Sequence, residues 1–384
     1  MPELWERYRD EFPVTKNLIY LNHAAVAPLP RRGAVAMQKL AQDALDFGSL
    51  HYGDWMATYE GLRVSAARLL NASPREIAIV KNTSEGIAIV ATGMQFQPGD
   101  VIVAFTEEFT ANLFPWRKLE TTGVEVRWLS IFDDPDKIDK AANGAKLLAI
   151  SFVNYLSGFR VNLERIGEIC ARRGCFFFVD AIQGMGAFPI DVDAAKIDAL
   201  AADGHKWMLG PEGCGILYVR RDKQIQIEPI QIGWTNFAHY ADYASRDMTY
   251  RNDAGRYESG TLNTIGCYGL KASLEVLLDI GIEAIAPAVQ VLTTRLAQGA
   301  ESLGFVLYCA RTAETGSGIV SIRKPGIDVT MLVRRLKSKN IVAAPRQGWV
   351  RFAPHFYISP DDIDAVLLEL RYALETCESS QSQG

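Results

Sequence analysis

The chain has 384 residues, of which 48% are hydrophobic and 22% are charged, as in ordinary globular proteins with a large domain and a smaller one. Its formal net charge of −5 argues against nucleic acid or an anionic membrane as the main partner. No apolar run approaches the roughly 20 residues that cross a bilayer, and the first residues lack the pattern of a secretory signal, so we expect a cytoplasmic protein. The cysteines and histidines are scattered without metal-ligand spacing, so no metal site is expected.

Along the first two thirds of the chain, short apolar runs alternate with helical patterns. The apolar runs predict strands at residues 77–80, 101–105, 124–128, 147–153, 176–180, 199–202 and 213–219. Helices are predicted at residues 84–94, 111–121 and 163–173. Strands separated by helices favour a mostly parallel sheet with helices on both faces. We therefore predict an α/β fold.

The pattern changes after residue 219. A stretch rich in glycine, asparagine and tyrosine at residues 232–260 precedes a long helical pattern at residues 262–279, and the last third resembles a smaller α/β unit. We expect an N-terminal segment that packs on the small domain, a large domain, a small C-terminal domain and a disordered polar tail. Their expected ranges are residues 1–20, 21–265, 266–376 and 377–384.

Polar side chains follow five of the predicted strands, and ligands of parallel sheets bind beyond the carboxyl ends of strands. Asp180 follows a Phe-Phe-Phe-Val run, and Lys206 lies in the Gly204-His205-Lys206 turn after the strand at residues 199–202. Singly, Asp180 is typical of a helix cap and Lys206 of a solvated side chain. Together they favour pyridoxal phosphate, whose aldehyde binds an amine and whose protonated ring nitrogen pairs with a buried carboxylate.

The turn at residues 82–86 lies between a predicted strand and a predicted helix. Free backbone N–H groups and the helix dipole make such a turn an anion site, and the hydroxyls of Thr83 and Ser84 add donors for a phosphate. His205 offers a further donor. The alternative is an ordinary helix start with Thr83 or Ser84 as its N-cap.

These motifs, in this order, resemble the class V aminotransferases, which are fold-type I pyridoxal-phosphate enzymes. The similar branch contains cysteine desulfurases, selenocysteine lyases and isopenicillin N epimerases. The resemblance runs from about residue 20 to residue 357 and implies a large cofactor-binding domain with a smaller C-terminal domain. It rests on the segments at residues 82–86, 108–116, 151–154, 179–183, 204–206, 210–213, 258–264 and 351–357.

The resemblance implies which residues contact the cofactor ring. Lys206 would bind the aldehyde covalently, and Asp180 would pair with the ring nitrogen. Asn154 and Gln183 would approach the ring hydroxyl. Phe109 stands where the desulfurases usually have a histidine stacked on the ring. An aromatic face still stacks there, but an acid or base on that side is lost.

The resemblance also assigns the phosphate. Thr83, Ser84 and His205 would hold it, and Thr261 would reach the phosphate of a neighbouring subunit, which implies a homodimer with active sites at the subunit interface. Asp203 stands where a serine is usual. A carboxylate beside a phosphate is unfavourable, so we expect Asp203 to turn away or to bind His205.

On the substrate side, Arg351 would bind the α-carboxylate of an amino acid. Asn22, His23 and Ala24 would lie near the substrate. Desulfurases carry a mobile cysteine shortly before this arginine, whereas residues 340–350 contain none, which argues against persulfide formation. Arg346 in that segment either reads a second acidic group of the substrate or is simply solvated.

We therefore predict an enzyme that acts at the α-carbon of a small amino acid. Transamination is slightly favoured because it needs no further protein nucleophile, while β-elimination by a C–S lyase and epimerisation stay open. A binding protein with the same fold is disfavoured by the intact Asp180 and Lys206 pair. A nicotinamide oxidoreductase would need a G-x-G-x-x-G turn after a strand, and the sequence has none.

Overall fold

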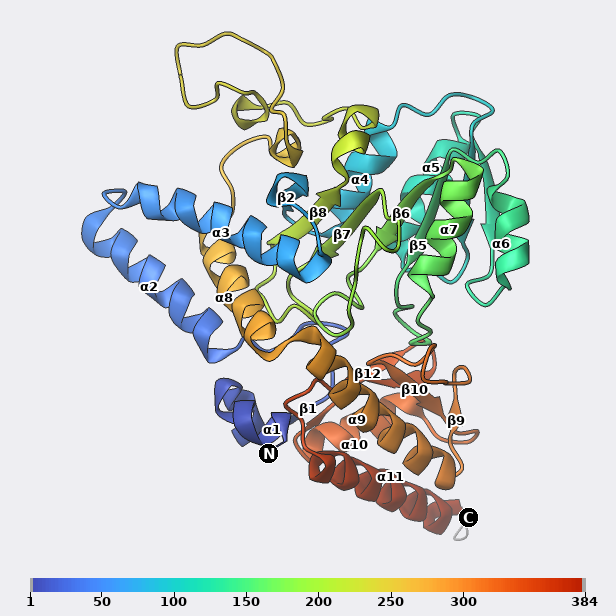
Figure 1. The fold of residues 1–384 in the computed structure, drawn as a ribbon. Coiled ribbons are helices and arrows are strands. Elements are labelled where there is room, and N and C mark those ends of the chain that lie inside the picture. Colours follow the sequence, from blue (N-terminus) through green and yellow to red (C-terminus); the bar gives the residue numbers. More distant parts are fainter. Residues whose placement is uncertain (1–2, 382–384) are drawn as a thin grey trace.

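A seven-stranded sheet forms the centre of the larger unit (Figure 1). The computed structural model describes residues 3–381, and the side chains of residues 3–375. In spatial order the strands are β2 (Ile77–Val80), β8 (Gly215–Val219), β7 (Ala199–Asp203), β6 (Phe176–Asp180), β5 (Leu147–Ser151), β3 (Val101–Phe105) and β4 (Glu125–Leu129). Within this sheet β8 alone runs against its neighbours. The predicted α/β fold with a mostly parallel sheet is confirmed.

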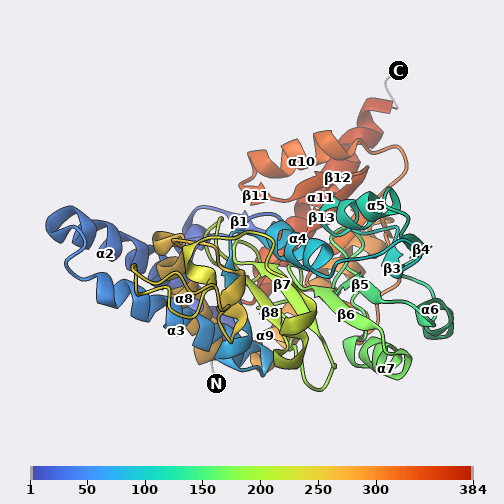
Figure 2. The same cartoon turned by 90° about the horizontal axis from the view of Figure 1, so that it is seen from above.

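Both faces of this sheet are buried. Successive side chains of a strand point to opposite faces, so Ile77 and Ile79 join one apolar cluster while Ala78 and Val80 join another. The first cluster also contains side chains of α3 (Tyr52–Leu70), α6 (Pro135–Ala142), α7 (Leu163–Arg173) and α8 (Thr264–Ile280). The second contains those of α4 (Thr83–Gly93) and α5 (Phe114–Glu120). Helices therefore cover both faces (Figure 2).

Two helix starts differ from the predicted ones. Neither Thr83 nor Ser84 is the N-cap of α4, because the side chain of Asn82 accepts the Glu85 N–H at 2.9 Å. The predicted helix at residues 111–121 is divided into a 3-10 turn at Thr110–Asn112 and α5 at Phe114–Glu120. Pro115 explains the break, because proline is tolerated in the first turn of a helix and not in its interior.

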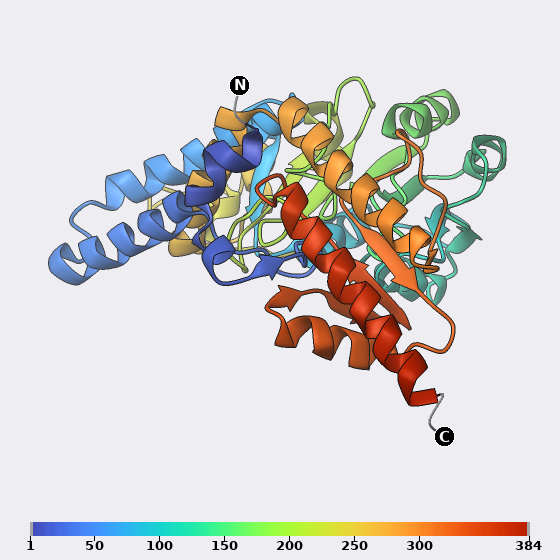
Figure 3. The same cartoon turned by 90° about the horizontal axis from the view of Figure 1, so that it is seen from below.

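A smaller unit follows α8. Its antiparallel sheet has the order β12 (Ala344–Arg346), β13 (Trp349–Phe352), β10 (Val320–Arg323) and β9 (Val306–Leu307). Its helices are α9 (Ile282–Ser302), α10 (Val329–Ser338) and α11 (Pro360–Gln381), and α9 and α11 lie side by side (Figure 3). Of the tail expected to be disordered, residues 377–381 continue α11, and residues 382–384 lie outside the described residues.

The boundary expected near residue 265 coincides with the start of α8. This helix packs against α3 and against α2 (Arg31–Phe47), so it lies with the larger unit, and α9 is the first helix of the smaller one (Figure 1). The domain division itself stays a prediction. Among the described residues no single helix is long and apolar enough to cross a membrane; α8 and α9 would pass that test together, but they are bent by 85°.

The N-terminal segment packs on the smaller unit. It contains α1 (Leu4–Tyr8) and β1 (Ile19–Tyr20), and β1 pairs in parallel with β11 (Ile341–Val342). The ring of Phe12 is fully buried and stacks on Tyr357 with 3.8 Å between ring centroids. From β1 the chain crosses toward the large sheet, where the Ala27 N–H donates to the carbonyl oxygen of His205 at 2.7 Å. This crossing brings residues 22–24 close to the end of β7.

Gly86 sets the distance between α4 and the sheet. A Cβ at this position would lie 2.7 Å from the Cβ of Ala201 on β7. We expect Gly86→Ala to lower the free energy of unfolding by about 1–3 kcal/mol, because overpacking outweighs the gain in helix propensity. Chemical denaturation would measure it. The matched control is Gly53→Ala in α3, where nothing lies within 4 Å; equal effects of the two substitutions would contradict the packing argument.

Candidate functional site

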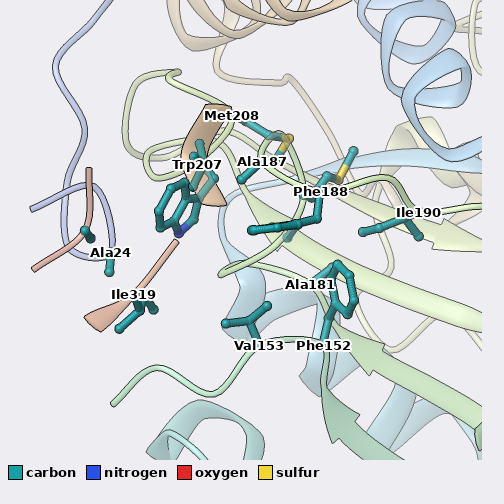
Figure 4. Close-up of a cluster of buried hydrophobic side chains, with 14 of the residues drawn as sticks. Ala24, Phe152, Val153, Ala181, Ala187, Phe188, Ile190, Trp207, Met208 and Ile319 are labelled. Atoms are coloured by element: carbon teal, nitrogen blue, oxygen red, sulfur yellow. The ribbon is translucent and has the colours of Figure 1, made fainter. Parts of the chain in front are cut away.

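The carboxyl ends of β2, β3, β5, β6 and β7 meet at one edge of the large sheet, because these strands all run in the same direction. The predicted polar residues after each strand are thereby brought together. Behind them, Trp207 packs in a buried apolar cluster with Ala187, Phe188 and Met208 (Figure 4). The turn that carries Lys206 therefore rests on a tightly packed, dry support.

Asp180 ends β6 and is only 3% exposed. Its carboxylate accepts one hydrogen bond, from the Ile182 N–H at 3.1 Å. Burial raises the pKa of Asp180 to about 6, and the charge of Lys206 acts in the opposite direction. A buried carboxylate with so few partners is stabilised by a nearby cation.

Lys206 is half-buried in the turn after β7. Burial lowers the pKa of its amine to about 8; Asp180 opposes this shift, whereas the charges of Arg351 and Arg346 add to it. The Lys206 Nζ lies 5.9 Å from the centroid of the Phe109 ring. An amine with a lowered pKa is uncharged, and so nucleophilic, in a larger fraction of molecules near neutral pH.

The turn is held by neighbouring backbone. The Gly204 N–H donates to the carbonyl oxygen of Cys214 at 2.9 Å, and a Cβ on Gly204 would approach that oxygen to 2.6 Å. Glycine at this position lets β7 and the start of β8 approach closely. The indole N–H of Trp207 donates to Gln183 at 3.0 Å, which anchors the residue next to Lys206.

The first turn of α4 faces the end of β7. Thr83 is buried, and its hydroxyl accepts the Asp203 N–H at 2.9 Å, while Ser84 is exposed. His205 Nδ1 lies 3.1 Å from Asp203 Oδ2, but it makes no hydrogen bond there, so the expected binding of His205 by Asp203 stays a prediction. Asp203 Oδ1 is buried without a hydrogen-bond partner. Helix N-terminus, hydroxyls and histidine together make a site for an anion.

The two amides expected at the ring hydroxyl are already engaged within the protein. Gln183 donates to the carbonyl oxygen of Ala24 at 3.0 Å besides accepting from Trp207. Asn154 donates to the carbonyl oxygen of Glu107 at 2.7 Å. Because a side-chain amide has two N–H groups, each residue keeps one donor for a ligand.

Arg351 lies on β13 of the smaller unit and is only 2% exposed. One of its terminal nitrogens donates to the carbonyl oxygen of Tyr155 at 2.8 Å, whereas its Nε is buried without a partner. Burial lowers the pKa of Arg351 to about 10, and the charge of Arg346 acts in the same direction. Phe109, 49% exposed, stands edge-on to the Tyr155 ring with 5.2 Å between centroids.

The residues expected at the substrate are bound to the protein itself. His23 is fully buried; its Nδ1–H donates to the carbonyl oxygen of Ala353 at 2.7 Å, and its Nε2 accepts from the Tyr357 hydroxyl at 2.5 Å. Neither nitrogen of His23 is left for a substrate. Ala24 is also buried, while Asn22 Oδ1 is buried without a partner and can still accept a donor.

Thr261 is exposed on the segment before α8. Within the described residues no hydrogen bond links it to the other predicted site residues, so a single chain does not bring it into the cluster. A contact across a homodimer stays a prediction.

Glu108 is the residue that sequence reasoning missed. It follows β3, is 5% exposed, and accepts from the backbone N–H of Ser151 at 2.6 Å and from the Ser151 hydroxyl. Burial raises the pKa of Glu108 to about 8, and the neighbouring charge of Asp180 contributes to this shift. The available signal was its position at a strand end, but the contact with Ser151 depends on the pairing of β3 with β5.

A lysine with a lowered pKa, a buried aspartate and a helix N-terminus lie together at the strand ends of a mostly parallel sheet. This arrangement is typical of enzymes of the pyridoxal-phosphate class. The comparisons agree. The aminotransferase class-V family model matches residues 19–348. The chain therefore belongs to the class-V aminotransferase family, and it is a pyridoxal-phosphate-dependent enzyme.

Similar proteins cover almost the whole chain. A probable cysteine desulfurase of Pyrococcus abyssi is 31% identical over 98% of this chain and 99% of its own length. An uncharacterized aminotransferase of Bacillus subtilis is 28% identical over 98% of each chain. The apo structure of a cysteine desulfurase from Thermococcus onnurineus has a TM-score of 0.90 at 26% identity, covering 98% of this chain and 99% of that one.

The residues present fit this cofactor. Among the described residues the carboxylate of Asp180 accepts a single hydrogen bond and forms no direct ion pair, and the charge of Lys206 acts on it only from a distance. A protonated ring nitrogen would supply a direct cationic partner. Thr83, Ser84 and His205 offer donors to a phosphate, and the amine of Lys206 has the lowered pKa that an aldehyde-binding lysine needs. Within the described residues no group of three or more His, Cys, Asp or Glu side chains could hold a metal ion.

The buried, neutral His23 predicts an acid-sensitive stability. Its pKa is about 4 in the folded chain against 6.5 when unperturbed, because burial disfavours the charged ring. Between these values the unfolded chain binds a proton that the folded chain does not, so the free energy of unfolding decreases as the pH falls. Each pH unit in this window costs about 1.4 kcal/mol at most.

Urea unfolding of His23→Gln at pH 7 and pH 5 tests this claim. Glutamine offers a donor and an acceptor but does not titrate, so the loss of stability on acidification should be smaller than in the wild type. His239→Gln, on an exposed part of the chain, is the control and should leave the pH dependence unaltered. Identical pH dependence in His23→Gln and wild type would show that the ring is not held neutral.

Proposed function

We propose that this protein is a C–S lyase that eliminates the sulfur substituent from the β-carbon of a cysteine-type amino acid. The sequence favoured transamination slightly, but cysteine desulfurases, which act on a C–S bond, are among the similar proteins, beside one uncharacterized aminotransferase. The observation that carries the proposal is a complete set of groups for Cα chemistry, Lys206, Asp180 and Arg351, beside a hairpin without a thiol.

The hairpin explains why a protein thiol is not part of the proposal. Strands β12 and β13 are joined by the two residues Gln347 and Gly348, both with positive φ, which leaves no loop that could carry a mobile cysteine. Cys309, outside the hairpin, donates to the carbonyl oxygen of Ser157 at 3.4 Å, and burial raises the pKa of its thiol. A thiol with a raised pKa is a poor nucleophile.

Each residue of the cluster has a defined task in this reaction. Lys206 would bind the cofactor aldehyde, Asp180 its ring nitrogen, and Thr83, Ser84 and His205 its phosphate, with Phe109 against the ring. When bound, pyridoxal phosphate supplies an aldehyde for the substrate amine and a ring that stabilises negative charge at Cα. These holding roles stay proposals.

The chain's own groups then act on the substrate. Arg351 orients the amino acid through its α-carboxylate, since a guanidinium binds a carboxylate with two parallel hydrogen bonds. The Lys206 amine would take the Cα proton as a general base. The electron pair of the Cα–H bond forms the Cα–Cβ double bond as the thiolate leaves. With one water the products balance as a thiol, pyruvate and ammonia.

Product analysis separates the possible reactions. The holoenzyme is incubated with L-cysteine, L-cystine and S-methyl-L-cysteine, whose sulfur products would be sulfide, a persulfide and methanethiol, and the sulfur product, pyruvate and ammonia are measured. Equimolar sulfur product, pyruvate and ammonia are expected from at least one of them. Amino-group transfer that requires an added keto acid, without pyruvate formation from these substrates, would replace the lyase by an aminotransferase. Formation of alanine, with the sulfur left on the protein, would instead assign the desulfurase reaction.

Lys206→Ala tests the role of the amine. The variant should no longer retain the cofactor after borohydride reduction and denaturation, and its elimination rate should fall by about 10²–10⁴-fold, which is what a positioned base contributes. Circular dichroism and melting temperature check the fold. Lys223→Ala, in the 3-10 helix at Arg221–Gln226 after β8, is the control. Cofactor fixed covalently in Lys206→Ala would refute the assignment.

Arg351→Ala tests the carboxylate contact. We expect KM to rise about 10–100-fold, because hydrogen bonds to a charged group contribute about 1.5–3 kcal/mol and each 1.4 kcal/mol is tenfold. Arg351→Lys keeps the charge without the planar fork and should recover only part of the loss. An unchanged KM in Arg351→Ala, with normal cofactor content, would remove Arg351 from the substrate.

A further inference from the structure

The β12–β13 hairpin presents two arginines on the same face. In its register Ala344 lies opposite Arg351, and Arg346 lies opposite Trp349. Side chains alternate along a strand, so Arg346 and Arg351 point to one side of the hairpin, as diagonal neighbours with Cα atoms about 7–8 Å apart. Arg351 is buried, whereas Arg346 near the hairpin tip is exposed. On this face of the hairpin the guanidinium of Arg351 is therefore the inner one and that of Arg346 the outer one.

Neither guanidinium has an acidic partner in the part of the chain whose side chains are described. Arg351 donates to the carbonyl oxygen of Tyr155, and its Nε is buried and unpaired. Arg346 donates to the carbonyl oxygen of its neighbour Pro345 at 3.0 Å. Two unneutralised cations on one face favour a ligand with two anionic groups.

Contacts between the two units hold the hairpin tip, and with it Arg346, close to the site. Gln347, next to Arg346, donates to the Tyr155 hydroxyl at 2.7 Å. Tyr155 in turn contacts the ring of Phe109, and Phe109 lies beside the Lys206 amine. The charge of Arg346 is close enough to lower the pKa of both Lys206 and Arg351. Arg346 is therefore an exposed arginine at the entrance to the site and not a remote surface residue.

We propose that Arg346 binds a second acidic group at the far end of the substrate side chain. This inference rests on the proposed function, in which Arg351 holds the α-carboxylate. The substrate class is then amino acids whose side chain ends in a carboxylate or a comparable anion, such as cysteine S-conjugates with an acid on the sulfur substituent. Arg346 acts as a specificity-determining residue, and the α-carbon chemistry stays with Lys206.

Binding of a matched pair of ligands tests this directly. S-carboxymethyl-L-cysteine and S-carbamoylmethyl-L-cysteine have nearly the same shape, and only the first carries the second acid. Their dissociation constants are measured by calorimetry on the cofactor-loaded Lys206→Ala variant, which binds without turning over. If that variant loses the cofactor, titration of the visible absorption of the wild-type holoenzyme gives the same ratio.

We expect the acid to bind about threefold to fivefold more tightly than the amide, as for an ion pair with an exposed arginine. The preference should shrink in roughly 1 M salt, where the Debye length is about 3 Å. Arg346→Gln should bring the ratio close to one and leave the affinity for the amide unaltered. Arg165→Gln, an exposed arginine on α7, is the matched control and should keep the preference.

Equal binding of acid and amide, or a preference that survives in Arg346→Gln, would overturn the inference. Loss of bound cofactor in Arg346→Gln would place this guanidinium on the cofactor instead and would also overturn it. Release of thioglycolate and pyruvate from the acid by the wild type is assayed separately. Absence of these products would count against the lyase reaction, while the binding ratio still decides the role of Arg346.

Discussion

Asp180 and Lys206 stabilise each other's charge at a place where burial penalises both. Burial raises the pKa of the carboxylate and lowers that of the amine, and their mutual attraction opposes each shift. The neighbouring packing and backbone contacts hold this pair in position. The packing of Trp207 and the close approach of Gly204 to Cys214 fix the turn, and the parallel strands fix the separation of the strand ends.

The smaller unit and the N-terminal segment complete the site from the opposite side. Arg351 comes from β13, and it is joined to the large unit through Tyr155. The segment at residues 22–27 crosses from β1 to the large sheet. Its His23 binds Ala353 and Tyr357 just beyond β13, and its Ala24 binds Gln183 of the large unit. A substrate held between Lys206 and Arg351 would therefore contact both units, and mutations in the crossing segment should affect binding through this alignment.

The sequence predicted the strands of the large sheet well, because six of its seven apolar runs are buried on both faces and only the edge strand β4 is partly exposed. It also indicated which strand ends carry polar groups. It could not predict contacts that depend on distant pairing. His23 is closed by residues about 330 positions away, and Glu108 is held by Ser151, which belongs to the next strand of the sheet. The prediction of the N-cap residue of α4 was wrong for a local reason. Asn82, Thr83 and Ser84 are all good N-cap residues, and only the backbone conformation distinguishes them.

The two-residue turn at Gln347 and Gly348 has a consequence for the fate of sulfur. A cysteine that transfers its bound sulfur to an acceptor has to move from the active site to that acceptor. This short hairpin offers no mobile loop for such a cysteine. Under the proposed reaction the sulfur leaves as a free, diffusible thiol or sulfide. The released sulfur compound would then be a small metabolite that another enzyme uses or that is exported. No partner protein would have to bind this enzyme to accept the sulfur.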